Sequence, residues 1–247
     1  MLIGGLQKNT LIDFPGRLAA TVFLCSCNFR CPWCYSRELV LPEAIENQPK
    51  IPEKDFFDFL EQRRGLLEGV VVCGGEPTMN KDLPEFIKKI KDLGYLVKLD
   101  TNGSNPEMLK KLISKKAKRD SLSSSTSFPQ SGNSLVDYVA MDVKLPKERY
   151  QEVLGVDVKK IDESIKILKK GEVDYEFRST IVPTIHTKED IVEIAKWIGG
   201  RGRYYLQNFR PEKTIDPEFE KLKPYPEEYL MEIKKAIAPF FEICKIR

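Results

Sequence analysis

The sequence predicts an α/β fold, a partial (β/α)6 TIM-type barrel with parallel strands, and two observations carry that prediction. Six runs that are apolar almost throughout alternate with helical patterns, as expected when strands of a parallel sheet are covered on both faces. Cysteines, glycines and charged residues gather just after these runs, and in a barrel the carboxyl ends of all strands share one catalytic face. A doubly wound sheet would satisfy the first observation, but the second favours the barrel.

Each predicted element follows from a local pattern of apolar residues. Strands are predicted at the buried apolar runs 18–24, 69–73, 95–100, 136–144, 175–182 and 203–209. Helices are predicted at the amphipathic stretches 55–67, 83–94, 106–114, 161–170, 189–198 and 226–241. Gly94 is the C-terminal stop of the second helix, because glycine is favoured just past a helix end.

One domain accommodates this pattern. Barrels of this size commonly form one domain, so residues 1–247 are predicted as a single unit with 1–17 as an N-terminal lead-in. The stretch 115–134 is basic and then Ser-rich, and it separates a predicted helix from the fourth strand. We expect a flexible insertion loop there, on the face opposite the active site. The alternative is a loop that docks a partner.

Composition excludes several classes of protein. With 41% hydrophobic and 31% charged residues, the chain reads as globular rather than disordered or membranous. No apolar run approaches the roughly 18 residues of a membrane span, and the first residues lack a secretory signal, so we expect a cytoplasmic protein without membrane contact. The net charge of +3 does not predict nucleic-acid binding. A single histidine, His186, leaves no basis for a histidine-rich metal site.

Four of the six cysteines lie within ten residues, and three kinds of site compete for them. Zinc would use all four of Cys25, Cys27, Cys31 and Cys34, although zinc knuckles usually bring two separated pairs. A ferredoxin-like cluster also requires four cysteine ligands, usually at other spacings. The third reading takes Cys27, Cys31 and Cys34 alone, in a C-x3-C-x2-C pattern that leaves one iron of a [4Fe–4S] cluster open to a ligand. Cys25 is then a small buried residue at the end of a strand.

The pattern from Cys27 to Cys34, with Trp33 before the last cysteine, resembles the signature of the radical S-adenosylmethionine (SAM) superfamily. A second motif, Gly74-Gly75-Glu76-Pro77, resembles the segment with which that superfamily binds the amino group of SAM. Its chemistry is plausible by itself, because glycines allow a close backbone approach and Glu76 offers an acceptor to an ammonium group. The resemblance places Trp33 and Tyr35 in the cofactor site as well.

Further segments resemble one branch, the glycyl-radical-enzyme activating enzymes. The resemblance implies that Asp100, Thr101 and Asp142 hold a monovalent cation, and that Lys144 and Arg178 contact SAM. Without the resemblance, Asp142 and Lys144 would form a buried ion pair. The opening stretch, together with the cysteine segment, looks closest to anaerobic ribonucleotide reductase activating proteins. Tyr35 departs from the histidine that follows the third cysteine in the pyruvate formate-lyase activator.

The resemblance implies an oxidoreductase that cleaves SAM reductively, forms a 5′-deoxyadenosyl radical and installs a glycyl radical on a partner enzyme. A flavodoxin or ferredoxin would supply the electron, since Cys244 is the only cysteine near the C-terminus and a second cluster is not expected. One alternative is a radical SAM enzyme that modifies a small molecule or a tRNA base, with Tyr204, Tyr205 and Arg210 as candidate base contacts. The other is a zinc-bound interaction module without catalysis.

Overall fold

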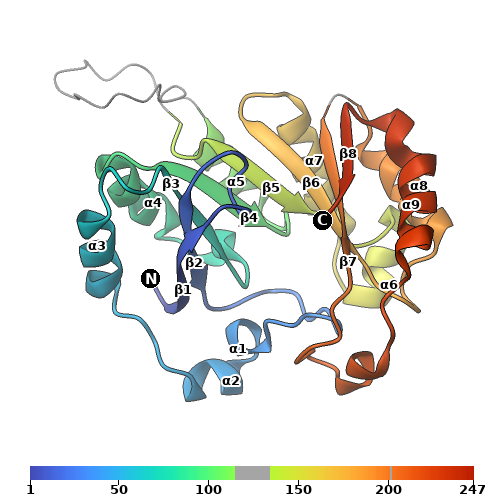
Figure 1. Ribbon diagram of the computed structural model, residues 1–247, viewed down its shortest axis with the longest axis horizontal. Coiled ribbons are helices and arrows are strands. Elements are labelled where there is room, and N and C mark those ends of the chain that lie inside the picture. The colour runs from blue at the N-terminus through green and yellow to red at the C-terminus, as the bar shows by residue number, and fades with distance from the viewer. Residues whose placement is uncertain (115–133, 201) are drawn as a thin grey trace.

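The computed structural model describes residues 1–114, 134–200 and 202–247. Its strands form one curved sheet in the order of the chain, from β1 to β8 (Figure 1). The strands are β1 (Ile3–Thr10), β2 (Ala19–Leu24), β3 (Gly69–Gly74), β4 (Leu96–Thr101), β5 (Tyr138–Asp142), β6 (Asp174–Ile181), β7 (Arg203–Asn208) and β8 (Ile243–Ile246).

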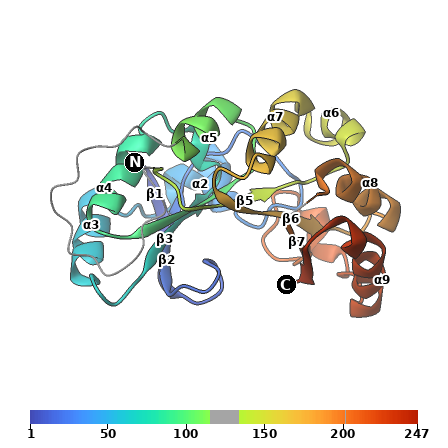
Figure 2. The ribbon, with the colours of Figure 1, turned by 90° about the horizontal axis from the view of Figure 1, so that it is seen from above.

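The helices lie mainly along one side of this sheet (Figure 2). They are α1 (Arg37–Val40), α2 (Pro42–Asn47), α3 (Glu53–Gln62), α4 (Leu83–Asp92), α5 (Pro106–Ile113), α6 (Tyr150–Leu154), α7 (Val158–Lys169), α8 (Lys188–Ile198) and α9 (Glu227–Ile237). Short 3-10 helices occupy Pro77–Met79, Lys147–Arg149, Pro217–Lys221 and Ala238–Phe240.

The pairing makes an incomplete barrel. Strands β2 to β8 pair in parallel with their neighbours, whereas β1 pairs antiparallel with β2, with Gln7 opposite Thr21. Strands β1 and β8 are the two edges of the described sheet and do not pair with each other. The predicted partial α/β barrel with parallel strands is therefore confirmed.

Two parts of the prediction were wrong in detail. The sheet has two strands beyond the predicted six, since β1 falls within the expected lead-in and β8 follows the last predicted helix. Strand β1 has glycines and four consecutive polar residues, and β8 is short and only half-buried, so neither gives a clean strand pattern. The helices α1, α2 and α6 were also missed, because four to six residues are too few to show a helical period.

Alternation along the strands separates an apolar outer layer from a polar interior. In β4, Val97 and Leu99 belong to the main apolar core, which also contains residues of α4 and α5. Lys98 and Asp100 alternate with them, so their side chains point into the barrel. The sheet thus supplies hydrophobic stabilisation on its outside and positions charged groups on its inside.

A group of charged and aromatic side chains, here called the amino-end cluster, contains Tyr138 and Glu176 from the amino-terminal halves of β5 and β6, together with Arg247, which follows β8. Glu176 of β6 is fully buried and accepts hydrogen bonds from Tyr138 Oη at 2.9 Å and from both terminal nitrogens of Arg247, at 2.8 and 3.2 Å. The Arg247 guanidinium also lies 3.5 Å from the centre of the Tyr205 ring. These contacts attach β8 to the barrel.

Two expectations concern segments away from this core. No helix among the described residues combines the length and the apolarity that crossing a membrane requires. The flexible loop predicted at 115–134 lies outside the described residues except for Ser134, so it stays a prediction.

Candidate functional site

A cavity of about 430 Å³ lies at the carboxyl ends of the strands, and most of the predicted site residues line it. Its wall includes Cys27, Cys31, Trp33, Cys34, Tyr35, Gly74, Gly75, Asp100, Thr101, Asp142, Lys144 and Arg178. These residues come from five segments of the chain, and the parallel barrel brings them together because their strands end at one face.

The three cysteines lie on the loop that joins β2 to α1. A backbone hydrogen bond of 3.0 Å from Cys34 N to Cys31 O tightens the loop between the last two. Cys27 Sγ accepts a hydrogen bond from Phe29 N at 3.3 Å and has Asn102 Nδ2 at 3.9 Å. The loop therefore presents three thiols to one cavity, and their binding of a cluster stays a prediction.

A segment after β7 supports this loop from behind. Ile215 N donates to Cys34 O, and Asp216 N donates to Pro32 O, both at 3.0 Å. Trp33, which is 5% exposed, packs near Phe219 with ring centres 6.3 Å apart. The cysteine loop is thereby held between the start of the barrel and its end.

Burial governs the protonation of the thiols. It raises the pKa of Cys27, and it raises the pKa of Cys31 to about 12, while the positive charge of Lys144 partly opposes both shifts. Cysteine binds metals as the thiolate, so these two residues are neutral thiols until a positively charged group binds.

The three thiols line one cavity. Within the part of the chain that the structure describes, no three His, Cys, Asp or Glu side chains form a group that could hold one metal ion. A tetrahedral zinc site needs all its sulfurs within about 2.3 Å of one centre. In a multi-iron cluster each sulfur binds a different iron, so three thiols around one cavity suit such a cluster.

Gly74 and Gly75 are required by the crossing of two backbones. A Cβ on Gly74 would lie 2.2 Å from Leu24 O, and one on Gly75 would lie 2.1 Å from Ser26 O. Gly74 also has φ of +131°, which side-chain-bearing residues rarely adopt. Gly75 N and Glu76 N donate to Leu24 O and Ser26 O at 2.9 and 2.7 Å. The glycine motif is therefore bonded directly to the start of the cysteine loop.

Glu76 lies behind the cavity wall. It is fully buried, and its carboxylate accepts hydrogen bonds from Thr101 Oγ1 at 2.7 Å, from Asn102 N at 2.6 Å and from Thr78. Burial raises the pKa of this carboxyl, and the hydrogen bonds oppose the shift. Neither Glu76 nor Pro77 lines the cavity. In this geometry Glu76 orients the turn after β4, and its predicted contact with an ammonium group stays a prediction.

A chain of five alternating charges, here called the charge network, runs from Lys98, behind the cavity wall, to Lys144, in the wall. Asp100 bonds Lys98 Nζ through Oδ1 and Arg178 Nη1 through Oδ2, the latter at 2.8 Å. Asp142 bonds Arg178 Nε through Oδ1 at 2.9 Å and Lys144 Nζ through Oδ2 at 3.2 Å. All four carboxylate oxygens are therefore paired with cationic nitrogens.

The network keeps Asp100, Asp142 and Arg178 charged. Burial disfavours the charged forms, yet Arg178 and Lys144 lower the pKa of Asp142 to about 2. Burial likewise opposes ionisation of Asp100, but Arg178 and Lys98 hold its pKa below the usual range. Despite burial, the two carboxylates raise the pKa of Arg178. The predicted ion pair of Asp142 and Lys144 is present, and both residues also line the cavity.

His186 and Tyr150 fix the backbone that carries Lys144. Tyr150 Oη accepts a hydrogen bond from Lys144 N at 2.9 Å. His186 Nδ1 accepts from Val182 N at 3.0 Å, so Nε2 carries the proton and donates to Lys144 O at 2.7 Å. Burial lowers the pKa of His186 to about 4, which keeps the ring neutral at physiological pH.

The other sequence candidates lie elsewhere. Cys25 is 1% exposed and packs with Leu39 and Ile45, away from the cavity wall. Tyr204 is fully buried and bonds Ser179, and Tyr205 lies under Arg247, so neither ring faces the cavity as a base-stacking surface would. Arg210 does line the cavity.

Sequence reasoning missed Lys98, Asn102 and the supporting role of His186. Asn102 donates to Asn28 Oδ1 at 3.1 Å and lies beside Cys27, linking the end of β4 to the cysteine loop. The signal for Lys98 was available, since a lysine inside an otherwise apolar strand must find a partner. The roles of Asn102 and His186 depend on tertiary contacts that no local pattern reveals.

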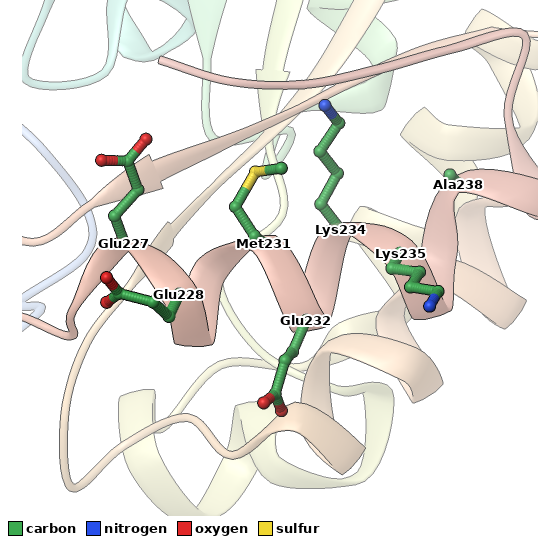
Figure 3. Close-up of a pocket in the computed structure, with 7 residues that line it drawn as sticks. All are labelled: Glu227, Glu228, Met231, Glu232, Lys234, Lys235 and Ala238. Carbon is green, nitrogen blue, oxygen red and sulfur yellow. The ribbon is translucent and has the colours of Figure 1, made fainter.

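A second hollow, of about 700 Å³, runs along the surface of α9 (Figure 3). It is lined by Glu227, Glu228, Met231, Glu232, Lys234, Lys235 and Ala238. These residues come from one helix and its end, so no side chains converge on a ligand from different elements. The cavity at the strand ends is the better candidate.

Known proteins match this chain along its length. Residues 21–198 match the family model described as Radical SAM superfamily. A Methanocaldococcus jannaschii protein, by its provisional name a glycyl-radical enzyme activating enzyme, is 33% identical over 256 residues, covering 100% of this chain and 95% of that protein. A second protein of that organism and name is 25% identical, covering 86% and 78%. A Thermococcus kodakarensis protein, provisionally named a GTP 3′,8-cyclase, is 25% identical, covering 85% and 67%.

Solved structures share the fold. Streptococcus suis SuiB matches with a TM-score of 0.61 at 15% identity, covering 92% of this chain and 48% of SuiB, so the chain spans about half of that protein. Escherichia coli QueE matches with a TM-score of 0.55 at 15% identity, covering 100% of this chain and 93% of QueE. At such identities the likeness concerns the fold alone.

Proposed function

Because this chain belongs to the radical SAM superfamily, we propose that it cleaves S-adenosylmethionine reductively, with one [4Fe–4S] cluster on Cys27, Cys31 and Cys34. The observation that carries the proposal is the convergence of these three thiols and the charge network on one cavity. When bound, the cluster supplies the electron that splits SAM into methionine and a 5′-deoxyadenosyl radical. Three protein thiolates leave the fourth iron open to SAM.

The residues of the cavity have distinct roles in this proposal. Lys144 and Arg178 bind the carboxylate of SAM, since each presents a buried or half-buried cation to the cavity. Gly74 and Gly75 give the amino group a close approach to the backbone of β3. Trp33 and Tyr35 form walls beside the cysteines, and Tyr35, which is 59% exposed, lies at the mouth.

The predicted monovalent cation does not fit the residues as they stand. Both carboxylates of Asp100 and Asp142 are paired with cationic side chains, and Thr101 Oγ1 donates to Glu76. A cation would have to displace these partners, so we assign it no role.

The proposed substrate is a glycine of a glycyl radical enzyme. Support comes from two relatives of that name, one of them similar over the full length of this chain. The electron would come from a separate flavodoxin or ferredoxin. The described residues outside the loop contribute only Cys73 and Cys244, which is too few for a second cluster of cysteines.

A small-molecule substrate is the second candidate, favoured by the similarity to a protein named a GTP 3′,8-cyclase. A tRNA base has less support, because Tyr204 and Tyr205 are buried away from the cavity. The match to the radical SAM family argues against a zinc-bound interaction module without catalysis.

The test uses anaerobically reconstituted protein, dithionite, SAM and a glycyl radical enzyme from the same organism labelled with [2,2-²H₂]glycine. We expect about four irons and four sulfides per chain, deuterium in the 5′-deoxyadenosine, and a glycyl radical EPR signal on the partner. Cys31→Ala is the matched control without a cluster. Unlabelled 5′-deoxyadenosine and no radical on the partner would instead favour a small molecule.

A further inference from the structure

Lys98 is a fully buried lysine inside the barrel. It lies in the middle of β4, opposite Val71 of β3 and Tyr138 of β5, and its relative exposure is 0%. Lysine is almost never buried to this degree unless it is paired, because removing an ammonium group from water is costly. Nothing in the proposed mechanism so far uses it.

The partner of Lys98 is Asp100, on the same face of the same strand. Lys98 Nζ bonds Asp100 Oδ1, while Arg178 Nη1 holds the other oxygen at 2.8 Å. Asp100 in turn lines the cavity, whereas Lys98 does not. Lys98 therefore touches no ligand in the cavity directly, and its hydrogen bond to the cavity wall is made to Asp100.

The position coincides with the site implied for a monovalent cation. The resemblance to activating enzymes placed that cation among Asp100, Thr101 and Asp142. Here Lys98 is bonded to a carboxylate oxygen that such a cation would need, and the remaining carboxylate oxygens bind Arg178 and Lys144.

With Lys98, the charge network has the same net charge that a bound monovalent cation would give it. Two carboxylates with Arg178 and Lys144 would sum to zero, and one monovalent cation would bring the group to a single positive charge. Lys98 brings the five-residue network to that same charge without an ion. One positive charge matches the single negative charge of an amino-acid carboxylate such as that of SAM.

We infer that the Lys98 ammonium takes the place of the monovalent cation, so that this enzyme binds SAM without one. Lys98 is a positioning residue: it neutralises and orients Asp100, which leaves Arg178 free to turn one of its donors toward the SAM carboxylate. The ammonium group is a compact point charge on a flexible stem, which suits it to replace a small ion. This inference rests on the proposed function, because it concerns the binding of SAM.

The first experiment uses the wild-type, cluster-loaded protein in potassium, sodium or choline chloride at equal ionic strength. SAM affinity should differ by less than about twofold among the salts, since surface screening is the same in each. The melting temperature should likewise agree among them. A saturable rise in SAM affinity or melting temperature with potassium or sodium would overturn the inference.

The second experiment compares Lys98→Met with Lys91→Met. Lys91 forms another largely buried ion pair, with Asp137, outside the cavity, and so controls for the loss of a lysine. In choline chloride, Lys98→Met should bind SAM at least about tenfold more weakly. Potassium or sodium should restore that affinity and raise the melting temperature of this variant alone, by about 2 °C or more.

The outcomes separate the two proposals. An equal loss of SAM affinity in every salt would make Lys98 a structural residue and overturn the inference. If Lys98→Met does not fold, the wild-type salt comparison still decides. A wild-type protein that loads its cluster but forms no 5′-deoxyadenosine in any salt would refute the proposed function, while the melting temperatures would still test Lys98.

Discussion

The barrel contains two groups of buried charges, and the two groups differ in what their charges face. In the amino-end cluster, Glu176 is fully buried and saturated by Tyr138 and Arg247, and none of the three lines the cavity. In the charge network at the carboxyl end, Asp100, Asp142 and Arg178 are paired with each other and also line the cavity.

The difference shows that buried ion pairs inside a barrel do not by themselves mark a site. In both groups, hydrogen bonds between the members offset the free-energy cost of removing the charges from water. Only the carboxyl-end group combines pairing with access to a ligand and with neighbouring thiols. We therefore expect changes at the carboxyl end to alter cofactor and SAM binding, and changes at the amino end to alter stability.

The largest effect is expected at the cysteines. Cys27→Ala, Cys31→Ala and Cys34→Ala should each lose the cluster and all SAM cleavage, because each removes a thiolate that the loop cannot replace. Cys25→Ala is the matched control and should keep the cluster, since Cys25 packs with Leu39 and Ile45 instead. Iron and sulfide quantification after anaerobic reconstitution measures this. Loss of the cluster from Cys25→Ala would mean that the ligand set is different.

The next effect concerns the charge network. Lys144→Ala should retain iron but bind SAM about 10- to 100-fold more weakly, because it removes a charge-assisted hydrogen bond worth about 1.5–3 kcal/mol. Lys147→Ala, which removes a lysine that pairs with Asp162 instead, should bind SAM normally. The change of the reduced cluster's EPR spectrum on SAM titration gives both affinities. Equal affinities for the two variants would contradict the assigned role of Lys144.

The amino-end cluster provides the opposite test. Arg247→Met should lower the free energy of unfolding by about 2 kcal/mol, because it leaves Glu176 buried with Tyr138 as its remaining partner. The melting temperature should fall by about 4–8 °C, while the SAM affinity of the folded protein stays unchanged. Differential scanning calorimetry and SAM titration on one sample measure both. Weaker SAM binding by Arg247→Met with unchanged stability would contradict the structural role assigned to the amino-end cluster.

The smallest effect is a pH dependence specific to the carboxyl end. His186 has a folded-state pKa of about 4, whereas an unfolded histidine has a pKa of about 6.5. The unfolded chain therefore binds an extra proton between these values, and stability falls as the pH falls through this window. At pH 5.5 His186 should cost about 1 kcal/mol relative to pH 7.5. Urea unfolding of wild type and His186→Gln tests this, because the difference in free energy should change with pH only for a titrating histidine.

The sequence predicted the strands whose neighbours cover both faces. Each of the strands β2 to β7 contributes apolar residues that pack in the core, although charged residues interrupt β4, β6 and β7, and such patterns can be recognised without tertiary information. Strands β1 and β8 are the sheet edges, where one side lacks a partner and polar residues are tolerated. Whether these two segments form strands depends on neighbours that are distant in sequence, so no local pattern predicts β1 or β8.

The site was predictable to the extent that its residues follow strand ends. Asp100 and Asp142 could be placed on one face because parallel strands end together, whereas Arg178, inside β6, followed only from the resemblance. Their partners could not be assigned, since Lys98 and His186 reach the site from positions that read as core. Glu76 shows the converse, because its motif predicted a ligand contact and the structure gives it four protein hydrogen bonds.

The backbone bonds between Gly75 and Leu24 and between Glu76 and Ser26 have a consequence for amide exchange. Residues that open together exchange their amide hydrogens together, with one opening free energy. Since the two glycine-motif amides are bonded to the start of the cysteine loop, they can exchange only when that loop separates from β3. Loading the cluster should therefore slow the exchange of Gly75 and Glu76, although neither residue supplies a thiol. Two motifs separated by about 40 residues in the chain would then behave as one cooperative unit in hydrogen–deuterium exchange.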